Sequence, residues 1–497
     1  MAYAIRLNSR LFANARRSFT ASYLTHGCQQ VSGGTTNVGN WPNLYLQKSY
    51  SSSTQSDAQL ILPDISPNAF AKRLNEKGIN RVYWVTSPKE RTVSCSHPDF
   101  AQFGSIFGKG DRDYNDHEGI FLEVGKRTNA LLGAFIWRSN RGQACGGVRL
   151  WNYERMEDFL RDGLRLAQGM GLKSALAGLW AGGGKGVVQM PEGERHKDAE
   201  FRTAMFHDYG EFLSSLNGCY VAAEDVGLNV NDLDDVNTFT RYTTCISETR
   251  GGSGNPSVAT GKGVICAMEG ALDHLQMGTL AGKSIAIQGA GNVATTIVDG
   301  LLQRDVGKIF ITDCNVDTIK RMQEKFSQDS DKVEIVKVDV GDNSVLSAPC
   351  DILSPCALGN ILNPSTIPGI KAKIVCGAAN NQLGCPADSE LLSKLGITYV
   401  VDFLANRMGI VNCANETYGR LTSDPAIERH FGRDWENSVF LMTKATIAKA
   451  DKDGISTHEA ANRIADELSL QLHPIWPNRS KEIIESLVNA KWHLQER

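Results

Sequence analysis

The sequence predicts an α/β protein with two domains, one of them built on a doubly wound parallel sheet. Its 497 residues, 41% of them hydrophobic, are enough for about two domains with separate cores. From about residue 254, short apolar runs alternate with helical patterns and Gly-rich turns, as in a parallel sheet. Residues 60–247 mix strands and helices without that alternation. The two halves are therefore expected to differ in architecture.

The N-terminal segment has the composition of an organellar transit peptide. Residues 1–56 contain no Asp or Glu, and their arginines, such as Arg6 and Arg16, alternate with Leu, Phe, Ser and Thr. A disordered tail is the alternative, but such tails do not usually exclude acids. We therefore predict a transit peptide and spacer at residues 1–57 and a location in the mitochondrial matrix.

The first half of the folded chain shows two strand runs and one long helix. Strands are predicted near 119–124 and 130–137, and they lead to the segment Ala144-Cys-Gly-Gly-Val-Arg149. Residues 156–170 carry a one-sided apolar stripe that predicts an amphipathic helix. The last segment, from about residue 424, has helical patterns and no strand run.

A dinucleotide site is predicted where the second half begins its sheet. The buried strand Ile285-Ala-Ile-Gln-Gly289 runs into Gly289-Ala-Gly-Asn-Val-Ala294 and a helix to Leu302. In this motif Gly289 permits the tight turn, Gly291 admits a pyrophosphate, and Ala294 allows close packing between helix and strand. Asn292 and Val293 complete the predicted contact with the phosphates.

A second strand, 308–312, ends at Asp313, 24 positions after Gly289. An acid at this distance accepts a hydrogen bond from the adenosine ribose 2′-hydroxyl and repels a 2′-phosphate, so the predicted cofactor is NAD rather than NADP. The alternative is a structural strand-turn-helix unit in which Asp313 is only a helix cap.

Charge and cysteine content narrow the class of partner. A formal net charge of −3 gives no basic field for nucleic acid or an anionic membrane surface, and no apolar run approaches the ~18 residues of a membrane span. Twelve cysteines occur without a C-x-x-C pair or a His/Cys cluster, which indicates reduced thiols and no metal site. The expected ligand is a small molecule.

A lysine pair marks the candidate catalytic half. Lys185 follows three glycines in Leu179-Trp-Ala-Gly-Gly-Gly-Lys185-Gly, and Lys173 lies twelve positions earlier. A lysine desolvated beside a second cation can act as a base near neutral pH. Taken alone, each lysine is more often a solvated surface residue.

Several motifs together resemble the glutamate/leucine/phenylalanine/valine dehydrogenase family, from about Gly119 to Tyr418. Besides the lysine segments, they are Ala222-Ala-Glu-Asp225-Val-Gly, Gly252-Ser-Gly-Asn-Pro-Ser257, Ala259-Thr-Gly-Lys-Gly263, Cys356-Ala-Leu-Gly359 and Ala379-Asn-Asn-Gln-Leu383. The resemblance implies a substrate-binding and oligomerisation domain (58–247 plus 425–497), a Rossmann-like NAD-binding domain (248–424), a closing cleft and a homo-oligomer.

The resemblance also implies roles for single residues. Lys173 is expected to hold the substrate α-carboxylate, Lys185 to activate water, and Asp225 to move a proton to and from the amino nitrogen. Asn381 is expected to bind the substrate, with Asn380 as a neighbouring alternative. Thr260 and Ala357 are expected to pack against the nicotinamide. From sequence alone, Asp225 and Asp232 could instead be helix caps.

Cys145 points to an apolar substrate. Glutamate dehydrogenases of the family place a lysine directly before the Gly-Gly pair, here Gly146 and Gly147, to bind the substrate γ-carboxylate; Cys145 offers no charge there. The rest of the expected pocket is also apolar: Ala223, Ile410 and Cys413. The alternative is that Ile410 and Cys413 are only core residues on a helix.

The predicted function is NAD-dependent oxidative deamination of a leucine-, valine- or phenylalanine-like L-amino acid to the 2-oxo acid, ammonia and NADH. Small Cys145 and Cys413 side chains keep a phenylalanine or tryptophan dehydrogenase open as an alternative. A second alternative is an NAD-binding regulatory homologue with weak turnover. It is raised by Arg407-Met408, which stands where the family commonly has Ala-Gly and adds bulk and charge.

Overall fold

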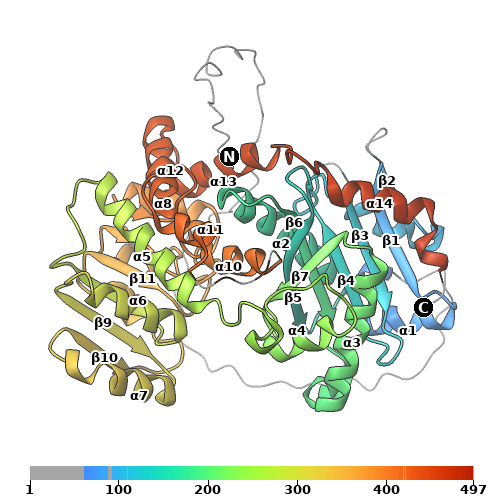
Figure 1. Ribbon diagram of the computed structural model, residues 1–497, viewed down its shortest axis with the longest axis horizontal. Coiled ribbons are helices and arrows are strands. Elements are labelled where there is room, and N and C mark those ends of the chain that lie inside the picture. Colours follow the sequence, from blue (N-terminus) through green and yellow to red (C-terminus); the bar gives the residue numbers. More distant parts are fainter. Residues whose placement is uncertain are drawn as a thin grey trace, which may run out of the picture. The chain divides into compact units, whose positions relative to one another are not determined.

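The computed structural model describes residues 61–87, 92–108, 110–417, 419, 421 and 423–495. The predicted transit peptide and spacer, residues 1–57, lie outside the described residues. The described chain contains two β-sheets, each covered by helices, which confirms the α/β class (Figure 1). Within this part of the chain, no helix has the length and apolarity needed to cross a membrane.

The first sheet is mixed and has seven strands in the order β2-β1-β3-β4-β6-β5-β7. Its antiparallel pairs run from β2 to β6, whereas β5 is parallel to both β6 and β7. The strands predicted near 119–124 and 130–137 are confirmed as β3 and β4. The strands are β1 (Arg81–Thr86), β2 (Val93–Cys95), β3 (Gly119–Val124), β4 (Leu131–Ile136), β5 (Ala144–Trp151), β6 (Gly182–Gln189) and β7 (Tyr220–Glu224).

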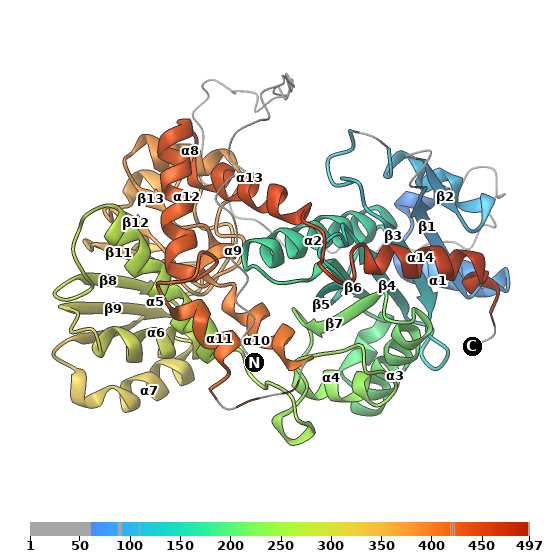
Figure 2. The same cartoon turned by 45° about the horizontal axis from the view of Figure 1, so that its top comes forward.

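Apolar cores form on both faces of this sheet. On one face α1 (Pro67–Glu76) and α2 (Met156–Leu176) pack through residues such as Phe70 and Phe159. The other face is covered by α3 (Ala199–Ser215), α4 (Val230–Asn237) and the C-terminal α14 (Arg479–Asn489). Figure 2 shows α14 along this sheet, far in sequence from its strands. The predicted helix 156–170 continues to Leu176, which places Lys173 inside it.

The second sheet is parallel throughout and has six strands in the order β10-β9-β8-β11-β12-β13. Numbered from β8, this order is 3-2-1-4-5-6, the Rossmann order, in which ligands bind where the order reverses between the first and fourth strands. The strands are β8 (Ser284–Gln288), β9 (Lys308–Asp313), β10 (Val333–Lys337), β11 (Ile352–Pro355), β12 (Ile374–Val375) and β13 (Thr398–Tyr399).

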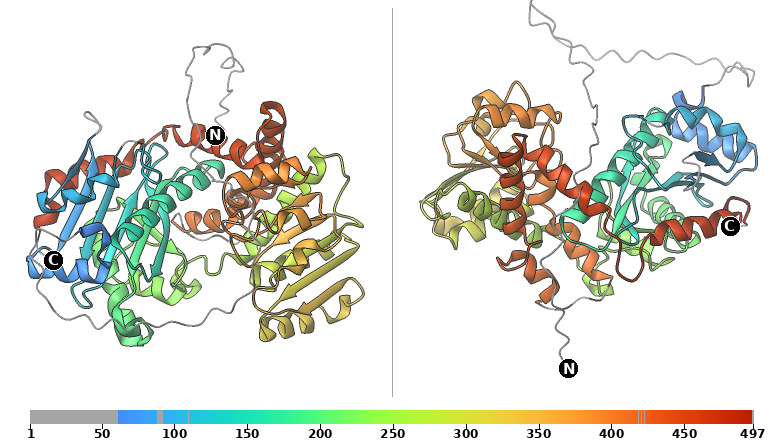
Figure 3. Two further views of the ribbon diagram at one scale, coloured as in Figure 1. Left: turned by 180° about the vertical axis from the view of Figure 1, so that it is seen from behind. Right: turned by 90° about the horizontal axis from the view of Figure 1, so that it is seen from above.

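The helices around the second sheet include the predicted helix after the glycine loop, here α6, which begins at Asn292. The C-terminal α12 and α13 contribute Val439 and Ala461 to the core around the second sheet. Because α14 packs on the first sheet, the red C-terminal helices of Figure 3 reach both sheets. The helices are α5 (Ser257–His274), α6 (Asn292–Leu302), α7 (Val316–Lys325), α8 (Ala387–Lys394), α9 (Asp402–Ala405), α10 (Met408–Glu416), α11 (Pro425–Glu428), α12 (Val439–Asp453) and α13 (Thr457–Ser469).

Candidate active site

Lys185 and Asp225 meet across the strand that separates them. Lys185 lies on β6 with only 3% of its surface exposed, and its Nζ donates a hydrogen bond to Oδ2 of Asp225, directly after β7. The intervening β5 carries Gly147 at this point, and a Cβ atom there would lie 2.6 Å from Cβ of Asp225. The glycine therefore leaves the space in which the ammonium and the carboxylate pair.

Lys173 comes to the same place from helix α2. This helix lies close to β6, and the glycine at position 183 permits the close approach: a Cβ atom there would be only 2.4 Å from the Ala167 carbonyl oxygen. Burial lowers the pKa of Lys173 to about 8, against the opposing effect of the carboxylates of Asp402 and Asp225. The lysine pair predicted from the sequence is thus brought together with Asp225.

Charge at this site is balanced by a residue that the sequence analysis missed. Arg149 Nε lies 3.4 Å from Asp225 Oδ2, and Arg149 Nη1 lies 2.9 Å from Asp162 Oδ2. Burial alone would raise the pKa of the Asp225 carboxyl, but Lys185 and Arg149 together lower it below its ordinary value. Burial lowers the pKa of Lys185, and Asp225 offsets only part of this effect. An anionic Asp225 thus faces a lysine that loses its proton more readily than in water.

A signal for Arg149 was present in the sequence. Side chains alternate along a strand, so Cys145, Gly147 and Arg149 share one face of β5. Because Cys145 and Gly147 were already candidates, the arginine two positions further was the next residue to consider.

The predicted apolar pocket gathers small side chains from three elements. In the register of the first sheet Gly147 is paired with Ala223, so Cys145 on β5 and Ala223 on β7 share a face. Cys413 lies on α10, one turn after the partly buried Ile410, and is itself buried. Its Sγ lies 2.6 Å from Sγ of Cys245, a residue that no pattern in the sequence indicated.

The thiols of Cys145 and Cys413 both have raised pKa values, and burial contributes to each. Hydrogen bonding to Cys245 and then burial raise the pKa of the Cys413 thiol well above its ordinary value, and Cys145 is close enough to add to the effect. Burial raises the pKa of Cys145 to about 12. All eleven cysteines in the described part of the chain are free thiols.

The glycine loop of the second sheet has the geometry of a phosphate-binding turn. Gly289 adopts a φ of +99°, and a Cβ atom there would lie 2.9 Å from Cβ of Ala357, so the two predicted residues adjoin at the reversal of strand order. At Gly291 an added Cβ atom would meet nothing within 4 Å. No side chain caps the N-terminus of α6, which leaves its first N–H groups to an anion.

Asp313 lies against this loop at the end of β9, as predicted. Its Oδ2 accepts a hydrogen bond from Ala290 N at 2.7 Å, and its Oδ1 accepts one from Asn315 N at 2.7 Å. A carboxylate offers about four acceptor positions, so these bonds leave capacity for a ribose hydroxyl. In the first turn of α6 Asn292 is exposed, Val293 is partly buried against the core, and Ala294 is buried. These residues fit a dinucleotide.

The loop with the paired asparagines is fixed to α9. Asn381 donates its backbone N–H to Oδ2 of Asp402 at 2.5 Å, and Asn406 donates its side-chain amide to Oδ1 of Asn380 at 2.8 Å. Because Asp402 also acts electrostatically on Lys173, this loop belongs to the same site. Thr260 on α5 faces α10 instead, since a Cβ atom on Gly409 would lie 3.1 Å from its Oγ1.

Arg407 and Met408, the pair that stands where the family commonly has Ala-Gly, are both fully buried. The Arg407 side chain is fully buried and donates from Nη1 to the Leu176 carbonyl at 2.6 Å and from Nη2 to the Asn437 carbonyl. Met408 packs where a Cβ atom on Gly263 would lie 2.7 Å from its Cγ. The guanidinium therefore binds the C-terminal end of α2, the helix that carries Lys173.

The alternative reading of the acidic pair holds for only one of its members. Asp232 forms a capping box with Asn229 at the start of α4 and also binds Arg202. Asp225 instead pairs with Lys185.

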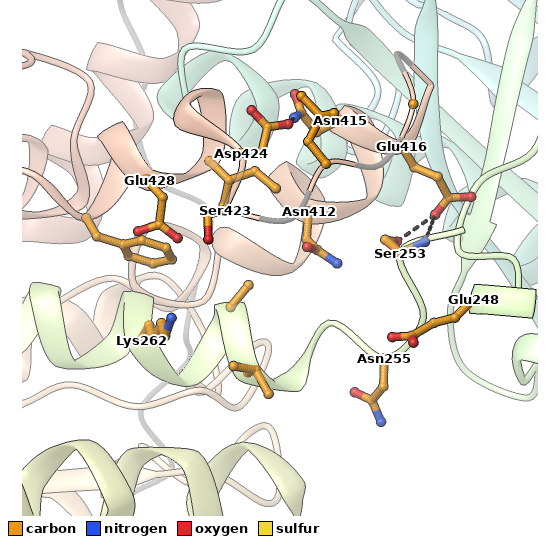
Figure 4. A pocket seen from close by; sticks show the side chains of 16 residues that line it. Glu248, Ser253, Asn255, Lys262, Asn412, Asn415, Glu416, Ser423, Asp424 and Glu428 are labelled. Atoms are coloured by element: carbon orange, nitrogen blue, oxygen red, sulfur yellow. Dashed lines mark hydrogen bonds between the residues drawn. The ribbon is translucent and has the colours of Figure 1, made fainter. Parts of the chain in front are cut away.

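A separate cavity of about 380 Å³ lies between α5, α10 and α11 (Figure 4). Its lining mixes polar and apolar side chains, and neither Lys185 nor Asp225 belongs to it; the charged members are Glu248, Lys262, Glu416, Asp424 and Glu428.

Comparison with known proteins gives matches over most of the chain. Residues 130–242 match the family profile described as "Glu/Leu/Phe/Val dehydrogenase, dimerisation domain", and residues 251–469 match "Glutamate/Leucine/Phenylalanine/Valine dehydrogenase". Leucine dehydrogenase of Geobacillus stearothermophilus is 37% identical over 71% of this chain and 90% of its own length. Phenylalanine dehydrogenase of Lysinibacillus sphaericus is 35% identical over 65% and 80%, respectively. The crystal structure of L-tryptophan dehydrogenase from Nostoc punctiforme aligns with a TM-score of 0.59, 29% identity and coverage of 71% of this chain and 96% of that one.

Proposed function

Because the chain belongs to the glutamate/leucine/phenylalanine/valine dehydrogenase family, it is an amino-acid dehydrogenase acting on a CH–NH2 group, and we propose that its substrate is an L-amino acid with an apolar side chain. The observation that carries this proposal is that Cys145, Ala223 and Cys413, the residues expected to line the substrate pocket, are uncharged; Cys145 and Ala223 share a face of the sheet, and Cys145 lies near Cys413. Burying a leucine-sized side chain there stabilises the complex by roughly 1.5–3 kcal/mol, whereas an unpaired γ-carboxylate is penalised.

The residues around Lys185 divide the proton transfers. We assign the Lys173 ammonium to the substrate α-carboxylate, in the place where Asp402 and Asp225 favour a cation. Asp225, held anionic by Lys185 and Arg149, accepts a proton from the substrate amino nitrogen. Lys185, whose pKa is lowered by burial, takes a proton from the water that attacks the imine carbon. Collapse of that adduct gives the 2-oxo acid and ammonia.

The cofactor assigned to the second sheet is NAD. Gly291 and the uncapped N-terminus of α6 would hold its pyrophosphate, and Asp313 its adenosine ribose. Bound NAD supplies the hydride acceptor for the α-carbon. Thr260 and Ala357 would lie beside the nicotinamide, and the chain's part there is to position it against the substrate.

A tryptophan- or phenylalanine-type substrate is the second candidate. The small side chains of Cys145 and Cys413 leave room for a ring, and the relatives include a phenylalanine dehydrogenase and an L-tryptophan dehydrogenase. A homo-oligomer is proposed as well, because residues 130–242 match a dimerisation domain. A regulatory homologue without turnover is less well supported, since Lys173, Lys185 and Asp225 meet as the chemistry requires.

A substrate panel tests the proposal directly. NADH formation is followed at 340 nm with leucine, valine, methionine, phenylalanine, tryptophan and glutamate as substrates. We expect kcat/KM to be highest for one of the apolar amino acids. Glutamate oxidation equal to that of leucine and phenylalanine would contradict the apolar pocket.

The substitution Cys145→Lys tests whether the uncharged residue at this position determines the preference for apolar substrates. An unpaired ammonium in the pocket should lower kcat/KM on apolar substrates by about 10²-fold or more, while glutamate gains a trace of activity. Cys145→Ala, which keeps the pocket apolar, is the matched control and should retain the wild-type order of substrates.

A further inference from the structure

The thiols of Cys245 and Cys413 lie side by side although 168 residues separate them in the chain. Cys245 lies in the segment between β7 and α5, and Cys413 lies on α10. Their sulfur atoms are 2.6 Å apart, and a disulfide bond requires about 2.05 Å. Little movement therefore separates the two thiols from bonding distance.

Glu416 already holds the two segments together. Its Oε2 accepts hydrogen bonds from Cys245 N at 3.0 Å and from Ser253 N at 2.8 Å, and its Oε1 accepts one from Ile246 N at 3.3 Å. Figure 4 shows Glu416 reaching from α10 to Ser253. Because Glu416 lies one turn after Cys413, both cysteine backbones are fixed before any bond forms between their side chains.

The surroundings favour pairing of these two thiols over other partners. Cys245 is 2% exposed and Cys413 7% exposed, so large reagents and the thiols of other proteins are kept away from both sulfur atoms. Cys145 is the third thiol of the group, but the direct sulfur contact is between Cys245 and Cys413.

We propose that Cys245 and Cys413 form an oxidation site, at which a peroxide converts the two thiols into a reversible disulfide. With hydrogen peroxide, two S–H bonds and the O–O bond break, one S–S bond forms, and two water molecules leave. Two electrons pass from the sulfurs to the oxygens. A dithiol reductant restores both thiols by thiol–disulfide exchange.

The effect on turnover rests on the proposed function. Cys413 lines the proposed substrate pocket, and Cys245 lies on the segment that follows Asp225 and leads into α5. A disulfide withdraws the Cys413 sulfur from the pocket and ties α10 to that segment. Because precise positioning of the substrate sets the rate, a changed pocket wall should lower turnover, and reduction should restore it.

Peptide mapping tests the disulfide independently of activity. The reduced full-length protein is freed of reductant, treated with hydrogen peroxide, alkylated, and digested without reduction. We expect one cross-linked product that contains Cys245 and Cys413, two hydrogens lighter than its separate peptides, and absent after dithiothreitol treatment. Recovery of both residues as alkylated thiols, or a cross-link to Cys145 instead, overturns the proposal.

Activity measurements test the consequence. Wild type and the control Cys385→Ser, at an exposed cysteine, should lose dehydrogenase activity on oxidation and regain it with dithiothreitol. Cys245→Ser should keep the activity it had before treatment, and Cys245→Ala repeats the test with an apolar side chain. Equal inactivation of the Cys245 variants overturns the regulatory effect. A cross-link in a protein that oxidises no amino acid overturns the proposed function and leaves the disulfide supported.

Discussion

At the scale of single residues, the proposed chemistry depends most directly on Lys185. The ammonium is buried and contacts Asp225, while the proposed cofactor contacts lie on the glycine loop of the other sheet. Lys185→Ala should therefore lower kcat by about 10²–10⁴-fold, the usual contribution of a general base, with little change in the Kd for NAD. Steady-state kinetics measure kcat, and a titration of the protein's fluorescence with NAD measures the Kd.

Lys320→Ala is the matched control for this substitution, because it removes an exposed lysine from α7. It should leave kcat unchanged. Wild-type turnover by Lys185→Ala would remove this lysine from the mechanism.

Lys173 also predicts a pH dependence. Lys173 binds the α-carboxylate only while protonated, and burial lowers its pKa to about 8 in the free enzyme. Because kcat/KM reports groups of the free enzyme, it should fall as pH rises through about 8, where Lys173 loses its charge. Lys173→Arg keeps the charge at high pH, so its alkaline limb should move upward even where its maximum is lower. An alkaline limb at the same pH in both proteins would assign that ionisation to another group.

At the scale of elements, the end of β9 is predicted to select the cofactor. The Asp313 carboxylate lies against the glycine loop and would accept the ribose 2′-hydroxyl. Asp313→Ala removes the acceptor and the repulsion of a 2′-phosphate, so KM for NAD should rise and the preference for NAD over NADP should fall by about 10-fold or more. Both cofactors are compared at saturating amino acid.

Asp313→Asn separates the two effects, because the amide can still accept from Ala290 N but carries no charge. A loss of preference shared by both variants points to electrostatic repulsion. An unchanged ratio in both would place cofactor selection elsewhere in the site.

The elements also show which parts of the fold were readable from the sequence. The strand, loop and helix at residues 284–302 are adjacent in the chain, so their apolar run and glycines were sufficient to predict them. The extension of α2 to Leu176 was not predicted, because its end is stabilised from outside by the Arg407 guanidinium. The contact between Cys245 and Cys413 depends on how α10 packs, and no local pattern encodes such a contact.

The candidate site also contains residues that the sequence predicted and residues that it did not. Lys173, Lys185 and Asp225 were predicted from motifs that resemble the family, and the structure brings them together. Arg149 was missed although its alternation with Gly147 along β5 marked it. Asp402 was missed because its importance lies in its effect on Lys173, a residue of the other sheet's helix.

At the scale of the whole molecule, the predicted transit peptide should be dispensable for folding and catalysis. Leu60–Arg497 forms a compact unit, and Lys173, Lys185, Asp225 and the glycine loop at Gly289 all lie within it. Because the site draws on elements from β5 to α10, a protein that begins at residue 58 retains every group the mechanism uses. Its kcat and KM should agree with those of the full chain within about twofold, and its Tm should change by less than about 2 °C, the shift expected for a loss of ~1 kcal/mol.

The targeting prediction is tested with a fluorescent fusion. Residues 1–57 fused to a fluorescent protein should direct it to mitochondria. The same segment with its four arginines changed to Gln should leave it in the cytosol, because a transit peptide is rich in arginine; the four are Arg6, Arg10, Arg16 and Arg17. Diffuse fluorescence from the unaltered fusion would refute the targeting prediction, and loss of turnover in the shortened enzyme would show that the first 57 residues contribute to the catalytic unit.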